Sequence, residues 1–226
     1  MARQRGVIKF KGTVGGLTFL ASGRVRAARG TYKEARINDV LQGNADKSAK
    51  VGALGSPILK QLKAIEQGFV PGNLWARMNS SMFKAKSMKA PDLLESLKGI
   101  ELNERYSYSK LFSAMPGVSF TVSKKRLVME MEVLSHPGFA RGVKASHYLC
   151  EVHVLFLDGK GSCLMDMMET EWISIKEDSG VYEMGFMIPK GTKYFLVVEG
   201  VRGGRDGKAV ESFLGRGFRI GGWGKC

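Results

Sequence analysis

The sequence contains little cysteine and little histidine, with three of each among 226 residues. The odd number of cysteines (Cys150, Cys163 and Cys226) argues against a framework of disulfide bonds. Neither a C-x-x-C nor an H-E-x-x-H pattern occurs, so we expect no metal site and no other cofactor. Cys150 falls in the run His147–Asp158 (HYLCEVHVLFLD), where a small buried hydrophobic residue is the simplest interpretation.

The histidines of that run are predicted to be solvated. His147, Glu151 and His153 alternate with apolar residues, so they fall on the polar face of one expected strand. At about 3.3 Å per residue the two histidines lie roughly 20 Å apart, too far to share one ion. The pattern therefore predicts exposed strand side chains.

Long apolar runs are also missing. No run approaches the roughly 18 residues that a membrane-spanning helix needs. The opening MARQRGVIKFKG carries charge but lacks the apolar stretch of a secretory signal. We therefore expect a protein without a signal peptide or transmembrane segment, located in the cytoplasm or in a virion.

Acidic residues are scarce in the first ninety positions. Residues 1–90 hold 17 Lys/Arg and 4 Asp/Glu, which gives a net charge of +13. Residues 91–226 hold 18 Lys/Arg and 17 Asp/Glu, which gives a net charge of +1. A pI near 9.8 is typical of nucleic-acid binding and also fits acidic lipid or an acidic protein. A solubility bias without any ligand is the simpler alternative. The segregation itself favours two modules with different roles.

The basic half begins with expected strands and continues with expected helices. Residues 7–11, 17–21 and 24–28 alternate as in a β-hairpin or meander, with a turn at Gly12–Gly16. Helices are predicted from Asp39 toward Ala49, from Ser56-Pro57 to Gly68, from Asn73 to about Ala85, and over 93–99. A ribbon of cations can lie along a phosphate backbone, or it can protect a sheet edge from aggregation.

From about residue 112 the pattern changes to period two. Six to eight strands with frequent turns predict an antiparallel sandwich or barrel. The expected fold class is therefore α+β: a basic N-terminal β-hairpin and helices, followed by an antiparallel β-sandwich or barrel. The expected domains are residues 1–99 and 100–226.

Catalytic patterns are weak. There is no G-x-S-x-G motif, and Gly203–Ala209 lacks the spacing and the hydroxyl of a phosphate-binding loop. Asp166, Glu169 and Glu171 are interpreted as a charged loop rather than as a glycosidase pair. Arg202–Arg205 and Gly215–Arg219 resemble fragments of Arg/Gly segments that bind single strands, although glycine-rich turns have the same composition.

The first 19 residues carry a pattern that can be compared with known families. Met1-Ala2-Arg3-Gln4, Gly6, Ile8-Lys9, Lys11-Gly12-Thr13, Gly15 and Phe19 form the pattern MARQxGxIKxKGTxGxxxF. This pattern resembles the start of an uncharacterised family in bacterial and phage genomes. The resemblance implies a basic N-terminus, a helical middle and a β-rich C-terminal half. It implies no activity and no catalytic residues.

Charge without a catalytic motif predicts binding or assembly. We expect a non-enzymatic, self-assembling structural protein, a homo-oligomer such as a phage coat or nucleocapsid component, that binds DNA, RNA or another polyanion through backbone phosphates. The alternatives are a β-sandwich binding module for a peptide or glycan with a basic docking arm, and an enzyme of unrecognised type. The expected contact residues are Arg3, Arg5, Lys9, Lys11, Arg24, Arg26, Arg29, Lys33, Arg36, Lys84, Lys86 and Lys89.

Overall fold

A computed structural model describes residues 2–3, 12–14, 17–19, 24–27, 39–65, 73–104, 107–140, 142–158, 161–176 and 180–226. The chain divides into two compact units, an N-terminal unit of residues 1–46 and a main unit of residues 47–226. The sequence prediction placed its domain boundary at residue 99. The helices after Asp46 share a core with the strands.

The N-terminal unit contains a small antiparallel sheet. Its strands are β1 (Ala2–Arg3), β2 (Gly12–Val14), β3 (Leu17–Phe19) and β4 (Arg24–Ala27), in the order β1-β4-β3-β2. Strands predicted near 17–21 and 24–28 are thus confirmed. Gly12–Val14 was wrongly predicted as part of a turn, because these residues pair with Leu17–Phe19. The strand predicted at 7–11 lies outside the described residues.

The described residues then form four α-helices: α1 (Asp39–Ile65), α2 (Leu74–Phe83), α3 (Ala90–Glu95) and α4 (Tyr108–Leu111). The predicted break before Pro57 is wrong, since α1 runs through it. Its buried residues, Val51, Ile58, Leu62 and Ile65, form one continuous stripe on both sides of the proline. Burial of that stripe outweighs the hydrogen bond that Pro57 removes. No helix in the described ranges is both long and apolar enough to cross a membrane.

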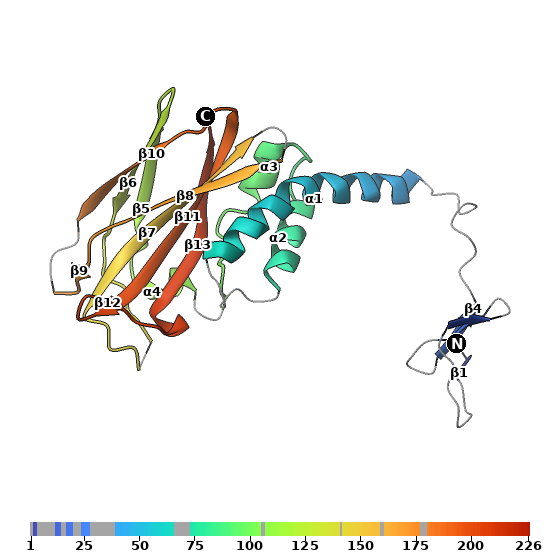
Figure 1. The fold of residues 1–226 in the computed structure, drawn as a ribbon, viewed down its shortest axis with the longest axis horizontal. Helices are drawn as coiled ribbons and strands as arrows, with labels where there is room; N and C mark the ends of the chain where they lie inside the picture. The colour runs from blue at the N-terminus through green and yellow to red at the C-terminus, as the bar shows by residue number, and fades with distance from the viewer. Residues whose placement is uncertain are drawn as a thin grey trace. The chain divides into compact units, whose positions relative to one another are not determined.

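The main unit is built on two antiparallel sheets (Figure 1). The central sheet has the strand order β12-β11-β7-β8. In addition, β13 pairs with β11, and β9 pairs with β7. Its strands are β7 (His147–Asp158), β8 (Cys163–Glu169), β9 (Ile173–Ser174), β11 (Thr192–Arg205), β12 (Lys208–Ala209) and β13 (Arg216–Lys225). The outer sheet has the order β10-β6-β5, with β5 (Gly117–Val122), β6 (Arg126–Glu132) and β10 (Val181–Met187). The predicted α+β class with a β-rich C-terminal region is confirmed.

Both faces of the central sheet are buried. On β7, Cys150, Val152, Val154 and Phe156 belong to a core shared with the outer sheet. Leu155 and Leu157 belong to a second core, which they share with α1, α2 and α3. The alternating directions of strand side chains produce this division. The described part of the main unit is therefore layered as helices, central sheet and outer sheet.

Candidate polyanion interface

Three of the predicted cationic residues fall on the sheet of the N-terminal unit. Arg3 of β1 pairs directly with Arg24 of β4, and Arg26 lies two residues further along β4. Positions directly opposite each other in an antiparallel pair are close neighbours, so the register brings these three positions to one part of the sheet. The predicted residues Arg5, Lys9, Lys11, Arg29, Lys33 and Arg36 lie outside the described residues.

The other three predicted residues lie in the main unit, between α2 and α3. Lys84, Lys86 and Lys89 are exposed, while Ala85 and Met88 pack against the helix-side core. The sequence predicted a helix to about Ala85, but α2 ends at Phe83. Lys86 and Lys89 therefore belong to a bent segment rather than to a helical face. The apolar residues anchor this segment and leave its ammonium groups in solvent.

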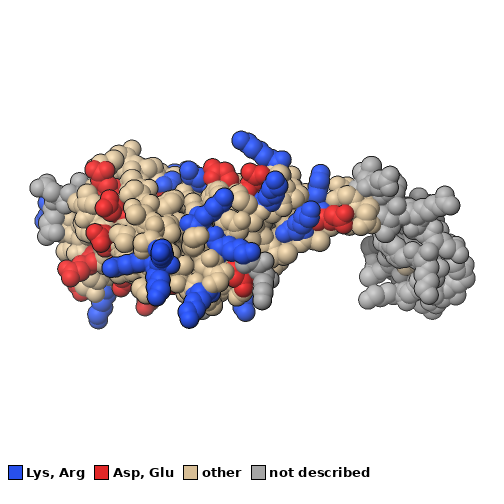
Figure 2. Space-filling model, turned by 90° about the horizontal axis from the view of Figure 1, so that it is seen from above, with Lys and Arg blue, Asp and Glu red and all other residues tan. Residues whose placement is uncertain are grey.

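The structure adds five further lysines that the prediction omitted. They carry exposed side chains on the helical layer, and together with Lys84, Lys86 and Lys89 we call them the lysine surface: Lys47, Lys50, Lys60, Lys63, Lys84, Lys86, Lys89 and Lys98. Figure 2 shows many Lys and Arg side chains over the helix-bearing part of the main unit, with some Asp and Glu among them, and a further group of Asp and Glu toward the opposite end. Helical spacing could have found Lys60 and Lys63, because both lie off the apolar stripe of α1.

The carboxylates nearest in sequence do not neutralise this surface. Among the described residues, no carboxylate forms an ion pair with a lysine of the surface. Asp92 accepts a hydrogen bond from the Ser87 hydroxyl, and Glu95 accepts one of 2.6 Å from the Trp223 indole. Both acids are thus held by neutral donors. The lysines remain available to an external anion.

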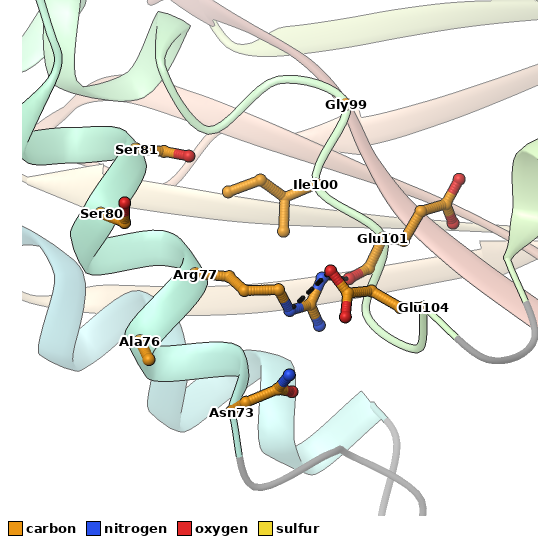
Figure 3. Close-up of a pocket in the computed structure, with 9 residues that line it drawn as sticks. All are labelled: Asn73, Ala76, Arg77, Ser80, Ser81, Gly99, Ile100, Glu101 and Glu104. Carbon is orange, nitrogen blue, oxygen red and sulfur yellow. Dashed lines mark hydrogen bonds and ion pairs between the residues drawn. The ribbon is translucent and has the colours of Figure 1, made fainter.

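A hollow of about 540 Å³ lies beside α2, but its arginine is already engaged (Figure 3). Arg77 donates to the carbonyls of Glu101 at 2.6 Å and Leu102 at 3.2 Å, and its Nε lies 3.5 Å from a Glu104 oxygen. The Glu101 carboxylate accepts the backbone N–H groups of Tyr108 and Ser109 at the start of α4. These contacts fasten the 99–109 segment to α2. With two carboxylates in its lining, the hollow is unsuited to an anion.

Glu151 and His153 are buried, which corrects the prediction of a solvated polar face. Glu151 is 1% exposed and His153 4% exposed. Glu151 Oε2 lies 3.0 Å from His153 Nε2, and its other oxygen pairs with Arg202. The Phe218 ring lies between Arg202 and His153, with its centroid 5.6 Å from the guanidinium carbon and 5.9 Å from the imidazole. We call Glu151, His153 and the partly exposed Arg202 the Glu151 cluster.

A second buried carboxylate pairs with the other Arg/Gly segment. Arg219 holds Glu199 through Nε and Nη2, each at 2.8 Å, and its guanidinium lies 5.2 Å from the Tyr108 ring. Burial raises the pKa of Glu199, and the adjacent Arg219 partly opposes that rise. Burial likewise raises the pKa of Tyr108 well above its usual value.

The Arg/Gly segments are therefore strand interiors. Arg202–Arg205 belongs to β11, and Arg216–Arg219 belongs to β13. A side chain at Gly204 would collide with the Trp172 ring, so glycine is needed there for close packing. Arg202 and Arg219 are each committed to a buried carboxylate. The interpretation of these segments as glycine-rich turns is therefore wrong, because their residues are paired within β11 and β13.

The carboxylates considered for catalysis do not all converge. Asp166 and Glu169 lie three residues apart on β8 and so face opposite sides of the sheet. Glu169 and Glu171 line a shallow hollow with Leu149, Thr170 and Trp172, and Asp166 is not part of its lining. Asp166 instead accepts the backbone N–H of Met167 at 2.9 Å.

The cysteines provide a direct check on the cores. Burial raises the pKa of Cys150 and of Cys163 to about 12, whereas Cys226 is exposed. We expect a thiol reagent at pH 8 to label one cysteine in the native protein and three after unfolding, because only exposed thiols ionise and react readily. Mass spectrometry of the labelled protein would measure this. Rapid native labelling of Cys150 would contradict the described core.

Comparison with known proteins gives no further identification. No protein-family model matches the sequence, and no curated protein matches it.

Proposed function

We propose that this protein is a self-assembling structural component that holds nucleic acid through its phosphate backbone, in the manner of a phage coat or nucleocapsid protein. The observation that carries the proposal is the lysine surface, eight exposed ammonium groups of which none lies within ion-pair distance of a carboxylate among the described residues. Such a surface attracts a polyanion by releasing its condensed counterions. The resemblance of the opening to phage-genome proteins supports the biological setting.

The chemistry of the surface favours contact without base reading. Lysine ammonium groups are compact point charges that pair with phosphates, whereas base edges are usually read by planar, bidentate groups such as arginine. The arginines at 202 and 219 are occupied by Glu151 and Glu199. Binding is therefore expected to depend steeply on salt and weakly on sequence.

The sharpest test of the interface replaces Lys84, Lys86 and Lys89 together by glutamine. We expect the slope of log affinity against log salt to fall by about 0.9 for each phosphate that the variant no longer neutralises, roughly 3 in total for double-stranded DNA. Fluorescence anisotropy with a labelled duplex and a labelled single strand, each titrated with salt, measures the slope.

A matched variant separates local binding from net charge. Lys124, Lys125 and Lys190 are equally exposed, but they lie at strand ends of the β-sandwich rather than on the helical layer. Their replacement by glutamine removes the same charge and is expected to change the slope far less. Equal effects of the two triple variants would show that total charge, and not the lysine surface, governs binding.

A further inference from the structure

The central sheet has one closed edge and one open edge. At the closed edge, residues 99–102 cover β13: Gly99 N donates to Ile220 O at 2.7 Å, and Leu102 N donates to Phe218 O at 2.8 Å. At the other edge, β8 pairs with β7 from Cys163 to Glu169, and no described strand pairs with its far side.

The open edge exposes several apolar side chains. Leu164 is 56% exposed, Met167 45% and Met168 37%. β8 (CLMDMME) contains no lysine or proline, the residues that most often guard an edge strand, although it carries two exposed carboxylates, Asp166 and Glu169. The nearby edge strand of the outer sheet, β10, also exposes Val181 and Met187. An edge of this length with unpaired backbone groups is a template for pairing with another strand.

The hydrogen bonds to β7 show which backbone groups point outward. Thr170 N donates to Cys150 O at 2.9 Å, and Asp158 N donates to Ser162 O at 3.1 Å. The even-numbered residues of 162–170 therefore face β7, and the odd-numbered ones face the open edge. Cys163 O already accepts from Gln61 at 2.8 Å, and Met167 N is bound by Asp166. Met165 and Glu169 are left with N–H and C=O groups that have no partner in the described ranges.

We propose that β8 pairs antiparallel with β8 of a second copy, about a twofold axis at Met167. This inference rests on the self-assembly part of the proposed function. In this register Met165 lies opposite Glu169 of the second copy, so their unpartnered backbone groups satisfy one another. Met167 on the axis also forms a hydrogen-bonded pair, so its N–H exchanges the Asp166 side chain for the Met167 carbonyl of the second copy. Asp166 lies opposite Met168. An axis at Asp166 is disfavoured because it sets two carboxylates directly opposite each other.

The register also keeps the carboxylates of β8 apart. Glu169 lies opposite Met165 and Glu171 opposite Cys163 of the second copy, so no two acidic residues face each other. The same patch serves both copies, as closed twofold symmetry requires.

Engineered cysteines test the register in nuclease-treated, nucleic-acid-free protein with Cys226→Ser. Met167→Cys places two thiols on the axis, where paired Cα atoms lie about 5.5 Å apart, within the range of a disulfide. We expect mild oxidation to give a covalent dimer. The control is Leu164→Cys, at a position that is more exposed than Met167 and whose two copies lie about 20 Å apart in this register. It is expected to stay monomeric on denaturing gels.

Sedimentation equilibrium of the unmodified chain over a concentration series gives an independent readout. We expect a reversible dimer, and we expect Met167→Lys to shift it to monomer with an unchanged circular dichroism spectrum. A chain that stays monomeric at every concentration would overturn the proposal, as would equal crosslinking at positions 164 and 167. Both measurements omit nucleic acid, so a dimer that binds no DNA or RNA would overturn only the proposed function.

Discussion

Replacing Glu151 by alanine is expected to lower the free energy of unfolding by about 3–5 kcal/mol, because it leaves the Arg202 guanidinium and the His153 ring without their carboxylate in a buried site. Glu151 is 1% exposed and bonds to both. Urea denaturation followed by circular dichroism measures the change.

Two further variants identify the cause. Glu183→Ala removes an exposed strand carboxylate that faces Glu130, so it is expected to cost little or to stabilise slightly. Replacing all three members of the Glu151 cluster by Leu or Met is expected to recover most of the stability, since a well-packed apolar group needs no ionic partner. A decrease below about 1 kcal/mol for Glu151→Ala would contradict the described burial.

Truncating Phe195 to alanine is expected to cost about 3–5 kcal/mol, comparable to other buried phenylalanines. Phe195 is fully buried between the two sheets and meets Phe120 edge to face at a ring separation of 5.2 Å. Its removal opens a cavity where the central sheet packs on the outer sheet. Thermal and chemical denaturation of the variant measure the change.

The partner ring is the matched control. Phe120 is 40% exposed, so Phe120→Ala removes less buried surface and is expected to cost clearly less than Phe195→Ala. Equal decreases in stability would mean that the outer sheet does not cover β11 as described. A double variant would also reveal the coupling between the two rings.

The strands were the part of the fold that sequence predicted best. Leu127, Met129 and Met131 alternate with more polar residues on β6, and the structure buries these three. Period-two burial is a local property, so it can be read from a short window. The boundary between the two units could not be obtained in this way, because it depends on where the helices pack.

Helix boundaries and buried charges depend on tertiary contacts. Pro57 is a sound signal for a helix start, yet the stripe from Val51 to Ile65 keeps α1 continuous. Glu151 and His153 look like an exposed face because they alternate with apolar residues. The unusually apolar remainder of β7 was the missed signal, since a central strand covered on both faces reads as a nearly continuous apolar run.

The candidate interface was predicted in part. Charge counting identified Lys84, Lys86 and Lys89, which the structure exposes, and it placed weight on the N-terminal arginines. It omitted Lys47, Lys50, Lys60, Lys63 and Lys98, because the emphasis fell on runs of charge rather than on the exposed face of the helical layer. That these residues bind nucleic acid stays a prediction.

The most direct measurement of the central claim is purification without nuclease at low salt, followed by the ratio of absorbance at 260 and 280 nm and electron microscopy. The account predicts assembled particles that carry nucleic acid, which high salt removes. Monomers free of nucleic acid at low salt would contradict it.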